Sequence, residues 1–114
     1  MKKMLFVCSS NKDRSRTAED MFRVEHPEHE YKSAGINRYR TGKYGTKMVD
    51  RELCEWADRI ICMEDIHKTK VCEYCGAEFE NKIIVLNLGD TEKYMSESLK
   101  SILRQKAEEK KIFS

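Results

Sequence analysis

The chain has 114 residues, 37% of them charged, and a formal net charge of +2. This length suits a single domain spanning residues 1–114, and no stretch has the composition of a linker or a repeat. No segment approaches the roughly 20 apolar residues of a membrane span, and the net charge is too small to indicate nucleic-acid binding. We therefore expect a cytoplasmic protein that binds neither a membrane nor a nucleic acid.

The first third of the chain predicts a strand, a helix and a second strand. The apolar run Lys3–Val7 has the composition of a strand that is buried on both faces. A helix from about Ser15 to His26 ends there, because Pro27 disfavours helical geometry in the residue before it. Glu30–Ala34 then predicts a short strand that Gly35 terminates.

The rest of the chain predicts the same alternation after a loop with turns at Gly42 and Gly45. Thr46 has the side chain of a helix N-cap, for a helix through about Ala57. A strand over Arg59–Met63 and a helix over Asp65–Cys75, which ends at Gly76, come next. A strand over Lys82–Asn87 and an amphipathic helix over Ser96–Lys110 complete the chain. Strands that alternate with helices indicate an α/β fold, with a parallel sheet between two helical layers.

Cys8 and Arg14 lie where the first strand gives way to the first helix, separated by five residues. A loop at such a junction points backbone N–H groups inward, and the helix N-terminus adds partial positive charge, so the concavity favours a phosphate group. The same field favours the thiolate form of cysteine, which is the nucleophile. The planar guanidinium of Arg14 can hold two oxygens of a transferring phosphoryl group. We therefore interpret the pair as the centre of a phosphoryl-transfer site.

The segment from Leu5 to Glu19 resembles the signature of the low-molecular-weight protein tyrosine phosphatases, in particular their short prokaryotic members. Further segments resemble the family in the same order along the chain, namely Ser33-Ala34-Gly35, Leu53 to Ile60, Met63 to Lys68, and Ile83 to Leu86 with Asp90 and Tyr94-Met95. The resemblance implies a three-layer α/β/α fold around a four-stranded parallel sheet in strand order 2-1-3-4. It also implies a phosphomonoester hydrolase that acts through a phosphocysteine intermediate, without a cofactor or metal.

The resemblance also assigns roles within the loop. The phosphate-binding residues it implies are Ser9, Ser10, Asn11, Lys12, Asp13 and Ser15. Among them, Asn11 braces the loop by hydrogen bonds and Ser15 stabilises the thiolate. Three residues depart from the family: Ser10 replaces the usual glycine, Asp13 a common cysteine, and Arg16 a common proline. If position 10 needs a positive φ, the loop carries strain there, and Arg16 adds a cation near the mouth.

Asp90, just beyond the fourth strand, is the candidate general acid and the base that afterwards activates water. Ligands bind at the carboxyl edge of such sheets, so we expect Cys8 and Asp90 to converge there. The family usually has Asp-Pro-Tyr in this loop, whereas this chain has Gly89-Asp90-Thr91-Glu92. Glu92 is therefore the alternative acid, and a turn-forming aspartate without a catalytic role is the remaining alternative.

From Tyr31 to Val49 the chain has no acidic residue but five cations, which are Lys32, Arg38, Arg40, Lys43 and Lys47. Such a run is either a solvated loop or an electropositive wall that attracts anionic substrates to the phosphate loop. On the second interpretation, Arg38, Tyr39 and Arg40 belong to the substrate rim. Tyr39 and Tyr44 can then flank the mouth and stack on an aryl ring.

The five cysteines, an odd number without a secretory signal, indicate reduced thiols rather than disulfides. Cys72 and Cys75 have the spacing of a metal or redox pair, but no second pair completes a zinc site, and we expect no metal. The pair keeps open an arsenate reductase, in which later cysteines take oxidising equivalents from the nucleophile. A non-catalytic phosphate-binding module is the other alternative, against which the retention of Cys8 argues. The expected partner is a phosphorylated substrate, either a phosphotyrosine protein or a small phosphate ester.

Overall fold

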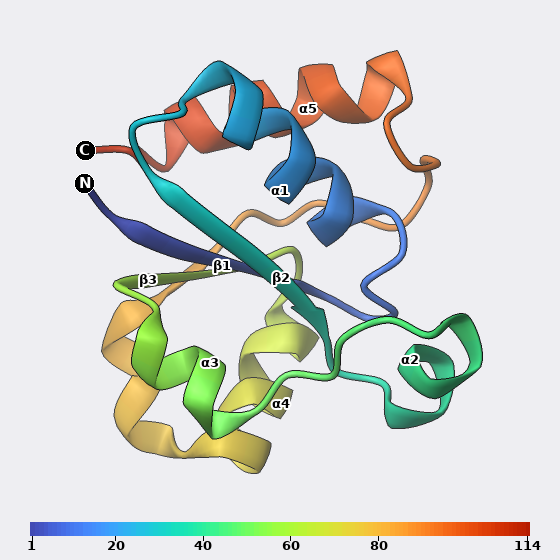
Figure 1. Cartoon of the computed structure of the whole chain (residues 1–114), viewed down its shortest axis with the longest axis vertical. Helices are drawn as coiled ribbons and strands as arrows, with labels where there is room; N and C mark the ends of the chain where they lie inside the picture. Colours follow the sequence, from blue (N-terminus) through green and yellow to red (C-terminus); the bar gives the residue numbers. More distant parts are fainter.

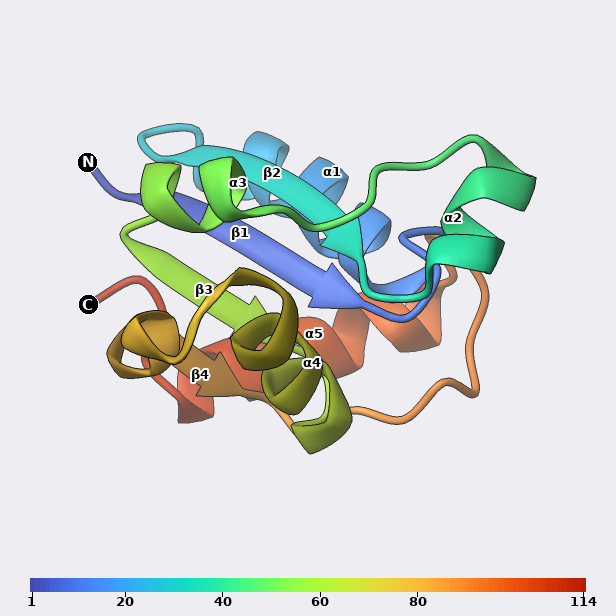
Figure 2. The same ribbon diagram turned by 90° about the horizontal axis from the view of Figure 1, so that it is seen from below.

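The computed structural model describes residues 1–114 (Figure 1) and contains one four-stranded sheet in the order β2-β1-β3-β4, whose strands are all labelled in Figure 2. All pairings are parallel, between β1 (Lys3–Cys8), β2 (Glu30–Gly35), β3 (Arg59–Cys62) and β4 (Ile83–Val85). Cys8 pairs with Gly35 at the end of β2, and Val7 pairs with Cys62 of β3. The α/β fold and the strand order expected from the sequence are confirmed.

Helices cover both faces of the sheet, as Figures 1 and 2 show. One layer holds α1 (Arg14–Glu25) and α5 (Glu97–Glu109), and the other holds α3 (Arg51–Trp56) and α4 (Asp65–Cys75). Side chains of β1 alternate between the layers, because successive strand residues point to opposite faces. Met4, Phe6 and Cys8 pack in the α1/α5 layer, and Leu5 and Val7 pack in the α3/α4 layer. Burial of both faces fixes β1, and with it the position of Cys8.

The basic segment after β2 contains a helix where the sequence indicated a loop. This helix, α2 (Arg38–Tyr44), begins after Asn37, whose side chain accepts a hydrogen bond from the backbone N–H of Arg40. It ends at Gly45, which has the left-handed φ of 65° that glycine adopts readily. Only Thr41 of α2 is buried, so the helix has no apolar stripe that periodicity could detect.

The helix expected from Thr46 to Ala57 is shorter than predicted. α3 begins only after Asp50, whose carboxylate accepts the backbone N–H of Leu53 at 2.8 Å. The preceding residues run beside the end of β2, where Gly35 donates to the carbonyl of Lys47 and accepts from the N–H of Val49. Hydrogen bonding at the sheet edge therefore prevails over the N-cap that Thr46 offers.

The last third of the chain brings the segment after β4 to the carboxyl edge of the sheet. α4 ends at Gly76, as predicted, and a 3₁₀ helix, η1 (Ala77–Lys82), leads into β4. β4 is shorter than predicted, but the chain continues along β3, since the N–H groups of Leu86 and Leu88 donate to the carbonyls of Cys62 and Met63. The whole chain contains no helix that is both long and apolar enough to cross a bilayer.

Candidate active site

A cavity of about 180 Å³ lies at the carboxyl edge of the sheet, where residues 9–13 connect β1 to α1. Its lining comes from the end of β1, the connecting loop, α2 and the segment after β4, and consists of Cys8, Ser9, Ser10, Lys12, Asp13, Arg14, Arg40, Tyr44 and Asp90. The structure thus brings Cys8, Arg14 and Asp90 together. A larger cavity of about 590 Å³ contains none of these three residues, and Arg16, expected near the mouth, lines that cavity instead.

The backbone N–H groups of the loop have no partner within the protein. Those of Ser9, Ser10, Asn11, Lys12 and Asp13 donate no hydrogen bond to a protein group. An N–H group that is withdrawn from water without an acceptor costs about 1–3 kcal/mol, so a row of them is expected only where a ligand or water accepts their bonds. The row leads directly into the N-terminus of the twelve-residue helix α1. Together they form a cradle for an anion.

Asn11 holds the loop in this shape. Its φ of 56° is left-handed, a conformation that asparagine adopts more readily than most residues. Its side-chain amide donates to the hydroxyls of Ser15 and Ser33, both at 2.8 Å, and its side-chain carbonyl accepts the N–H of Lys47 at 3.2 Å. The strain expected at Ser10 is not found, because the positive φ falls one residue later.

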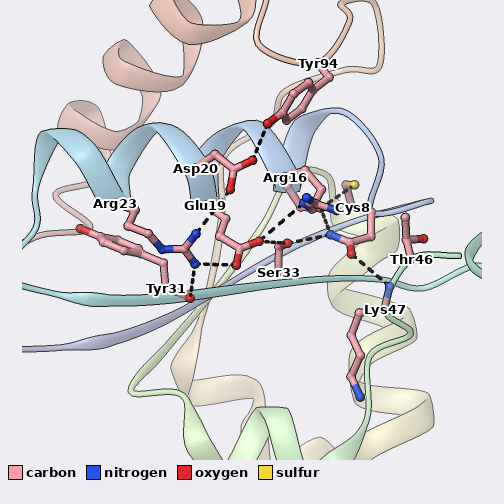
Figure 3. A network of polar contacts seen from close by, with 12 residues as sticks. Cys8, Arg16, Glu19, Asp20, Arg23, Tyr31, Ser33, Thr46, Lys47 and Tyr94 are labelled. Carbon is pink, nitrogen blue, oxygen red and sulfur yellow. Dashed lines mark hydrogen bonds and ion pairs between the residues drawn. The ribbon is translucent and has the colours of Figure 1, made fainter. Parts of the chain in front are cut away.

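The sulfur of Cys8 lies 3.0 Å from the hydroxyl oxygen of Ser15. That oxygen already accepts a bond from Asn11, which leaves the Ser15 proton for the sulfur. The second partner of Asn11, the hydroxyl of Ser33, donates in turn to the carboxylate of Glu19. Figure 3 shows this chain of contacts from Cys8 to Glu19. The carboxylate fixes Ser33 as a donor, and the hydroxyl of Ser15, which accepts from Asn11, can donate its proton to a thiolate at Cys8.

The end of β2 approaches the loop so closely that only glycine fits there. A Cβ atom on Gly35 would lie 2.7 Å from the carbonyl oxygen of Ser9 and 2.9 Å from the backbone nitrogen of Asn11. That Ser9 carbonyl accepts the N–H groups of Ile36 and Asn37, at 3.0 and 2.9 Å. The carbonyl of Ser9 is thereby turned toward β2.

Arg14 is 2% exposed and is held from one side. Its Nη1 donates to the carboxylate of Glu64 at 2.5 Å and to the carbonyl of Leu88 at 2.8 Å. Its Nε lies 3.7 Å from Asp90 Oδ1, and its Nη2 donates to no protein group. Two nitrogens, Nε and Nη2, with three N–H groups between them, therefore remain for the oxygens of an anion. The sequence placed Glu64 in a turn that resembles the family but did not identify its ion pair with Arg14.

His67, which is fully buried, supports the loop from α4. Its Nδ1 accepts the backbone N–H of Glu64 at 3.0 Å, so the neutral ring carries its proton on Nε2, 3.0 Å from the hydroxyl oxygen of Ser9. Burial, reinforced by the charge of Arg14, lowers the pKa of His67 to about 4. The sequence placed His67 in a family-like turn without recognising its contact with the loop.

Asp90, and not Glu92, lies at the cavity. The carboxyl of Asp90 is about half exposed and faces the guanidinium of Arg14. The carboxylate of Glu92 instead accepts the hydroxyl of Ser98 at 2.8 Å, near the start of α5, and does not line the cavity. The geometry therefore favours the first of the two acids considered from the sequence.

The segment that carries Asp90 is fastened to the first turns of α1. The carboxylate of Asp13 accepts the backbone N–H of Tyr94 at 2.9 Å, and the hydroxyl of Thr17 accepts that of Met95 at 2.9 Å. The hydroxyl of Tyr94 donates to Asp20, a contact drawn in Figure 3. Asp13, where the family commonly has cysteine, makes no side-chain cap on α1 and instead holds this segment.

Of the three residues expected at the rim, only Arg40 lines the cavity, whereas Arg38 and Tyr39 do not. Tyr44, one turn after Arg40 on α2, also lines it. The ammonium group of Lys12 lies 4.6 Å from the centre of the Tyr44 ring. The rim is therefore built from one face of α2 and from the loop.

The other cysteines lie apart from Cys8. Cys54, Cys62 and Cys75 are buried in the α3/α4 layer, on the opposite face of the sheet. Cys72 is partly buried on the same helix as Cys75. Burial raises the pKa of Cys54 to about 12 and also raises the pKa of Cys75. All five thiols are free, and these two stay protonated at neutral pH.

Solved structures with this fold include several bacterial phosphatases. Wzb of Vibrio vulnificus, in complex with benzylphosphonate, has a TM-score of 0.75 at 19% identity, over 98% of this chain and 96% of that one. The tyrosine phosphatase AmsI of Erwinia amylovora has a TM-score of 0.71 at 20% identity, over 95% and 90%. The YwlE arginine phosphatase of Geobacillus stearothermophilus has a TM-score of 0.65 at 21% identity, over 97% and 87%.

No family model matches the sequence, and no curated protein matches it significantly. The likeness therefore rests on the three-dimensional arrangement, which spans nearly the whole chain. The chain has the fold of the low-molecular-weight tyrosine phosphatases.

The buried neutral His67 predicts a specific loss of stability in mild acid. Because its pKa falls from the ordinary 6.5 to about 4 on folding, the unfolded chain binds the extra proton. Its contribution is complete above pH 6.5 and is lost as the pH falls toward 4, with a slope of up to about 1.4 kcal/mol per pH unit. We expect urea unfolding between pH 7 and 4 to show this slope in the wild type and not in His67→Gln. Parallel curves for the two proteins would contradict the assignment.

The contact between Asp13 and Tyr94 predicts the rigidity of the acid-bearing segment. A hydrogen bond to a charged group contributes about 1.5–3 kcal/mol, so Asp13→Ala should speed amide hydrogen exchange at Tyr94 by about tenfold or more. Asp13→Asn keeps an oxygen acceptor and should stay within a few-fold of the wild type. Unchanged exchange at Tyr94 in Asp13→Ala would show that other contacts hold the segment.

Proposed function

We propose that this protein is a cysteine-dependent phosphomonoester hydrolase of the tyrosine-phosphatase type. The observation that carries the proposal is the row of five unpartnered backbone N–H groups that follows the thiol of Cys8, with the buried Arg14 at its end. Such a cradle binds the peripheral oxygens of a phosphoryl group through its own donors. The reaction we derive needs no metal or cofactor. Its substrate is a phosphotyrosine protein or a small phosphate ester.

Cys8 is the nucleophile. Its thiolate, which the Ser15 hydroxyl stabilises at 3.0 Å, attacks phosphorus in line with the leaving oxygen. The S–P bond forms as the P–O ester bond breaks, which gives phosphocysteine and the free alcohol. A water molecule then attacks phosphorus, the S–P bond breaks, and inorganic phosphate leaves with the thiolate restored.

Arg14 stabilises the phosphoryl group while charge moves onto its oxygens. Nη2 and Nε bind two of these oxygens, and Glu64 and the carbonyl of Leu88 keep Nη1 in place. Because the side chain is buried and already fixed, little reorganisation accompanies the reaction. Removing one such preorganised donor in other enzymes costs about 10²–10³ in rate.

Asp90 is the general acid and then the general base. In its protonated form it donates to the leaving oxygen during the first step, and as a carboxylate it accepts a proton from the attacking water during the second. Its position 3.7 Å from Nε of Arg14 keeps the carboxyl beside the group that binds the phosphoryl oxygens. The ester oxygen is then within its reach.

Proteins with the same fold support this reaction class. Wzb of Escherichia coli K30 is a tyrosine phosphatase solved in complex with phosphate, and other neighbours are arginine phosphatases. We favour an aryl phosphate over a phosphorylated arginine because Lys12 and Arg40 line the cavity. Their positive charges oppose the approach of a cationic guanidinium group.

The two alternatives have less support. An arsenate reductase needs a second thiol to attack the Cys8 adduct, whereas Cys75 is buried on the opposite face of the sheet with a raised pKa, and Cys72, on the same helix, does not line the cavity of Cys8. A phosphate-binding module needs neither a thiol nor an acid at its cavity. Here the cavity holds both Cys8 and Asp90.

Loss of the nucleophile or of the arginine should abolish the activity. We expect Cys8→Ser and Arg14→Ala each to release no phosphate from 4-nitrophenyl phosphate above background, because a serine hydroxyl is not ionised by this loop. Cys72→Ser, which removes a thiol on α4 away from the cavity, is the matched control and should keep the wild-type rate. Circular dichroism checks the fold of each variant, and full activity in folded Cys8→Ser protein would refute the mechanism.

The general acid should be recognisable by its dependence on the leaving group. Asp90→Asn should lower kcat/KM, which reports the step that releases the leaving group, by about 10²–10⁴-fold for phenyl phosphate, the usual contribution of general acid catalysis. The loss should be smaller for 4-nitrophenyl phosphate, whose leaving group departs without a proton. Glu92→Gln is the control and should match the wild type on both substrates. The opposite result, with the loss in Glu92→Gln alone, would transfer the role to that residue.

A further inference from the structure

We propose that Lys12 and Arg40 form a second anion-binding site at the mouth of the cavity, so that the preferred substrate carries a second anionic group beside the phosphoryl group that reacts. The inference rests on the proposed phosphatase function and narrows its substrate class. Its most direct form is a phosphotyrosine flanked by aspartate or glutamate side chains.

The charges of Lys12 and Arg40 have no counter-ion in the protein. Both residues are exposed and line the cavity, yet neither forms an ion pair. Some exposed cations have partners, such as Lys47, which lies 3.2 Å from Asp50, whereas others, such as Arg38, have none. What distinguishes Lys12 and Arg40 is that they also line the cavity. Uncompensated like charges at a cavity mouth raise the local concentration of anions.

The carboxylates of the same cavity are already engaged. Asp13 accepts the N–H of Tyr94, and Asp90 faces the guanidinium of Arg14, which Glu64 also contacts. None of these carboxylates forms an ion pair with Lys12 or Arg40, although Asp13 keeps its negative charge. Lys12 and Arg40 therefore remain free to pair with an anionic group of a ligand.

The two cations are held in a fixed relation to the loop. Arg40 and Tyr44 stand one helical turn apart, on one face of α2, and the ring of Tyr44 supports the ammonium group of Lys12 at 4.6 Å. α2 is joined to the loop at both ends, because the N–H of Asn37 donates to the carbonyl of Ser9 and the hydroxyl of Thr46 donates to that of Ser10. The part of the rim that carries Arg40 is thus tied to the loop that carries Lys12.

The size of the cavity places the second anionic group outside it. Pockets that enclose whole small molecules measure about 300–1,000 Å³, whereas this cavity measures about 180 Å³. It takes the phosphoryl group and the start of its ester, and the rest of the substrate lies across the rim. Side chains next to a phosphotyrosine therefore come within reach of Lys12 and Arg40.

Two phosphotyrosine peptides of equal length test the proposal, one with glutamate and one with glutamine on both sides of the phosphotyrosine. The leaving group is identical, so a difference in kcat/KM reports the flanking charge alone. Exposed ion pairs are weak, and we expect the wild type at low salt to prefer the glutamate peptide by about two- to fivefold per pair. The preference should fade toward 0.15 M salt, where the Debye length falls to about 8 Å.

Arg40→Ala and Arg38→Ala separate a local site from general attraction. Both remove one positive charge from α2, but only Arg40 lines the cavity. The backbone N–H of Arg40, which Asn37 caps, is kept in the alanine variant. We expect Arg40→Ala to lose most of the preference for the glutamate peptide and Arg38→Ala to retain it. Equal losses in both variants, or no preference in the wild type, would overturn the proposal.

Binding of the same peptides to Cys8→Ser protein, measured by calorimetry, distinguishes failure of the site from failure of the enzyme. A preference for the glutamate peptide in binding, with no turnover of either peptide by the wild type, would refute the phosphatase and leave the anion site. Turnover of both peptides at equal efficiency, with equal binding, would refute the anion site alone. Absence of both binding and turnover would refute both.

Discussion

The carboxyl edge of this sheet depends on the hydrogen bonds of one side chain, that of Asn11. The loop must leave five N–H groups unpartnered and still keep one residue left-handed, a conformation that costs about 1–2 kcal/mol. The three hydrogen bonds of the Asn11 side chain contribute about 0.5–1.5 kcal/mol each and outweigh that cost. They also orient Ser15 toward Cys8. The anion cradle and the environment of the thiol therefore have one common support.

Arg14 connects the cradle to the remainder of the site. A buried guanidinium without a counter-ion would be destabilising by several kcal/mol, and Glu64 supplies the charge that prevents this. The backbone N–H of Glu64 also donates to Nδ1 of His67, and Nε2 of His67 contacts the hydroxyl of Ser9. The start of α4 thus fixes both the arginine and the first residue of the loop.

The parts predicted correctly from the sequence are those with local causes. The change from the apolar run of β1 to a helix at residue 14 indicated the loop and its two chemical groups, and Gly76 marked the end of α4. α2 was not predicted because Thr41 is its only buried residue, which leaves no apolar periodicity. Thr46 does not cap a helix because the residues that follow it form hydrogen bonds with the end of β2. Glu64 and Tyr94 are 50 and 81 residues from their partners Arg14 and Asp13, a separation that no spacing rule reaches.

Asp13 is an anion beside an anion-binding site, and its structural role depends on its neighbour Arg14. The side chains of these consecutive residues bind the two ends of one segment, since Arg14 donates to the carbonyl of Leu88 and Asp13 accepts the N–H of Tyr94. Asp90 lies between these anchors. Two consecutive residues of the loop and the first turn of α1 therefore hold the acid-bearing segment on both sides of Asp90. The aspartate adds negative charge near the phosphate site, but its hydrogen bond to the segment keeps the acid aligned with the arginine.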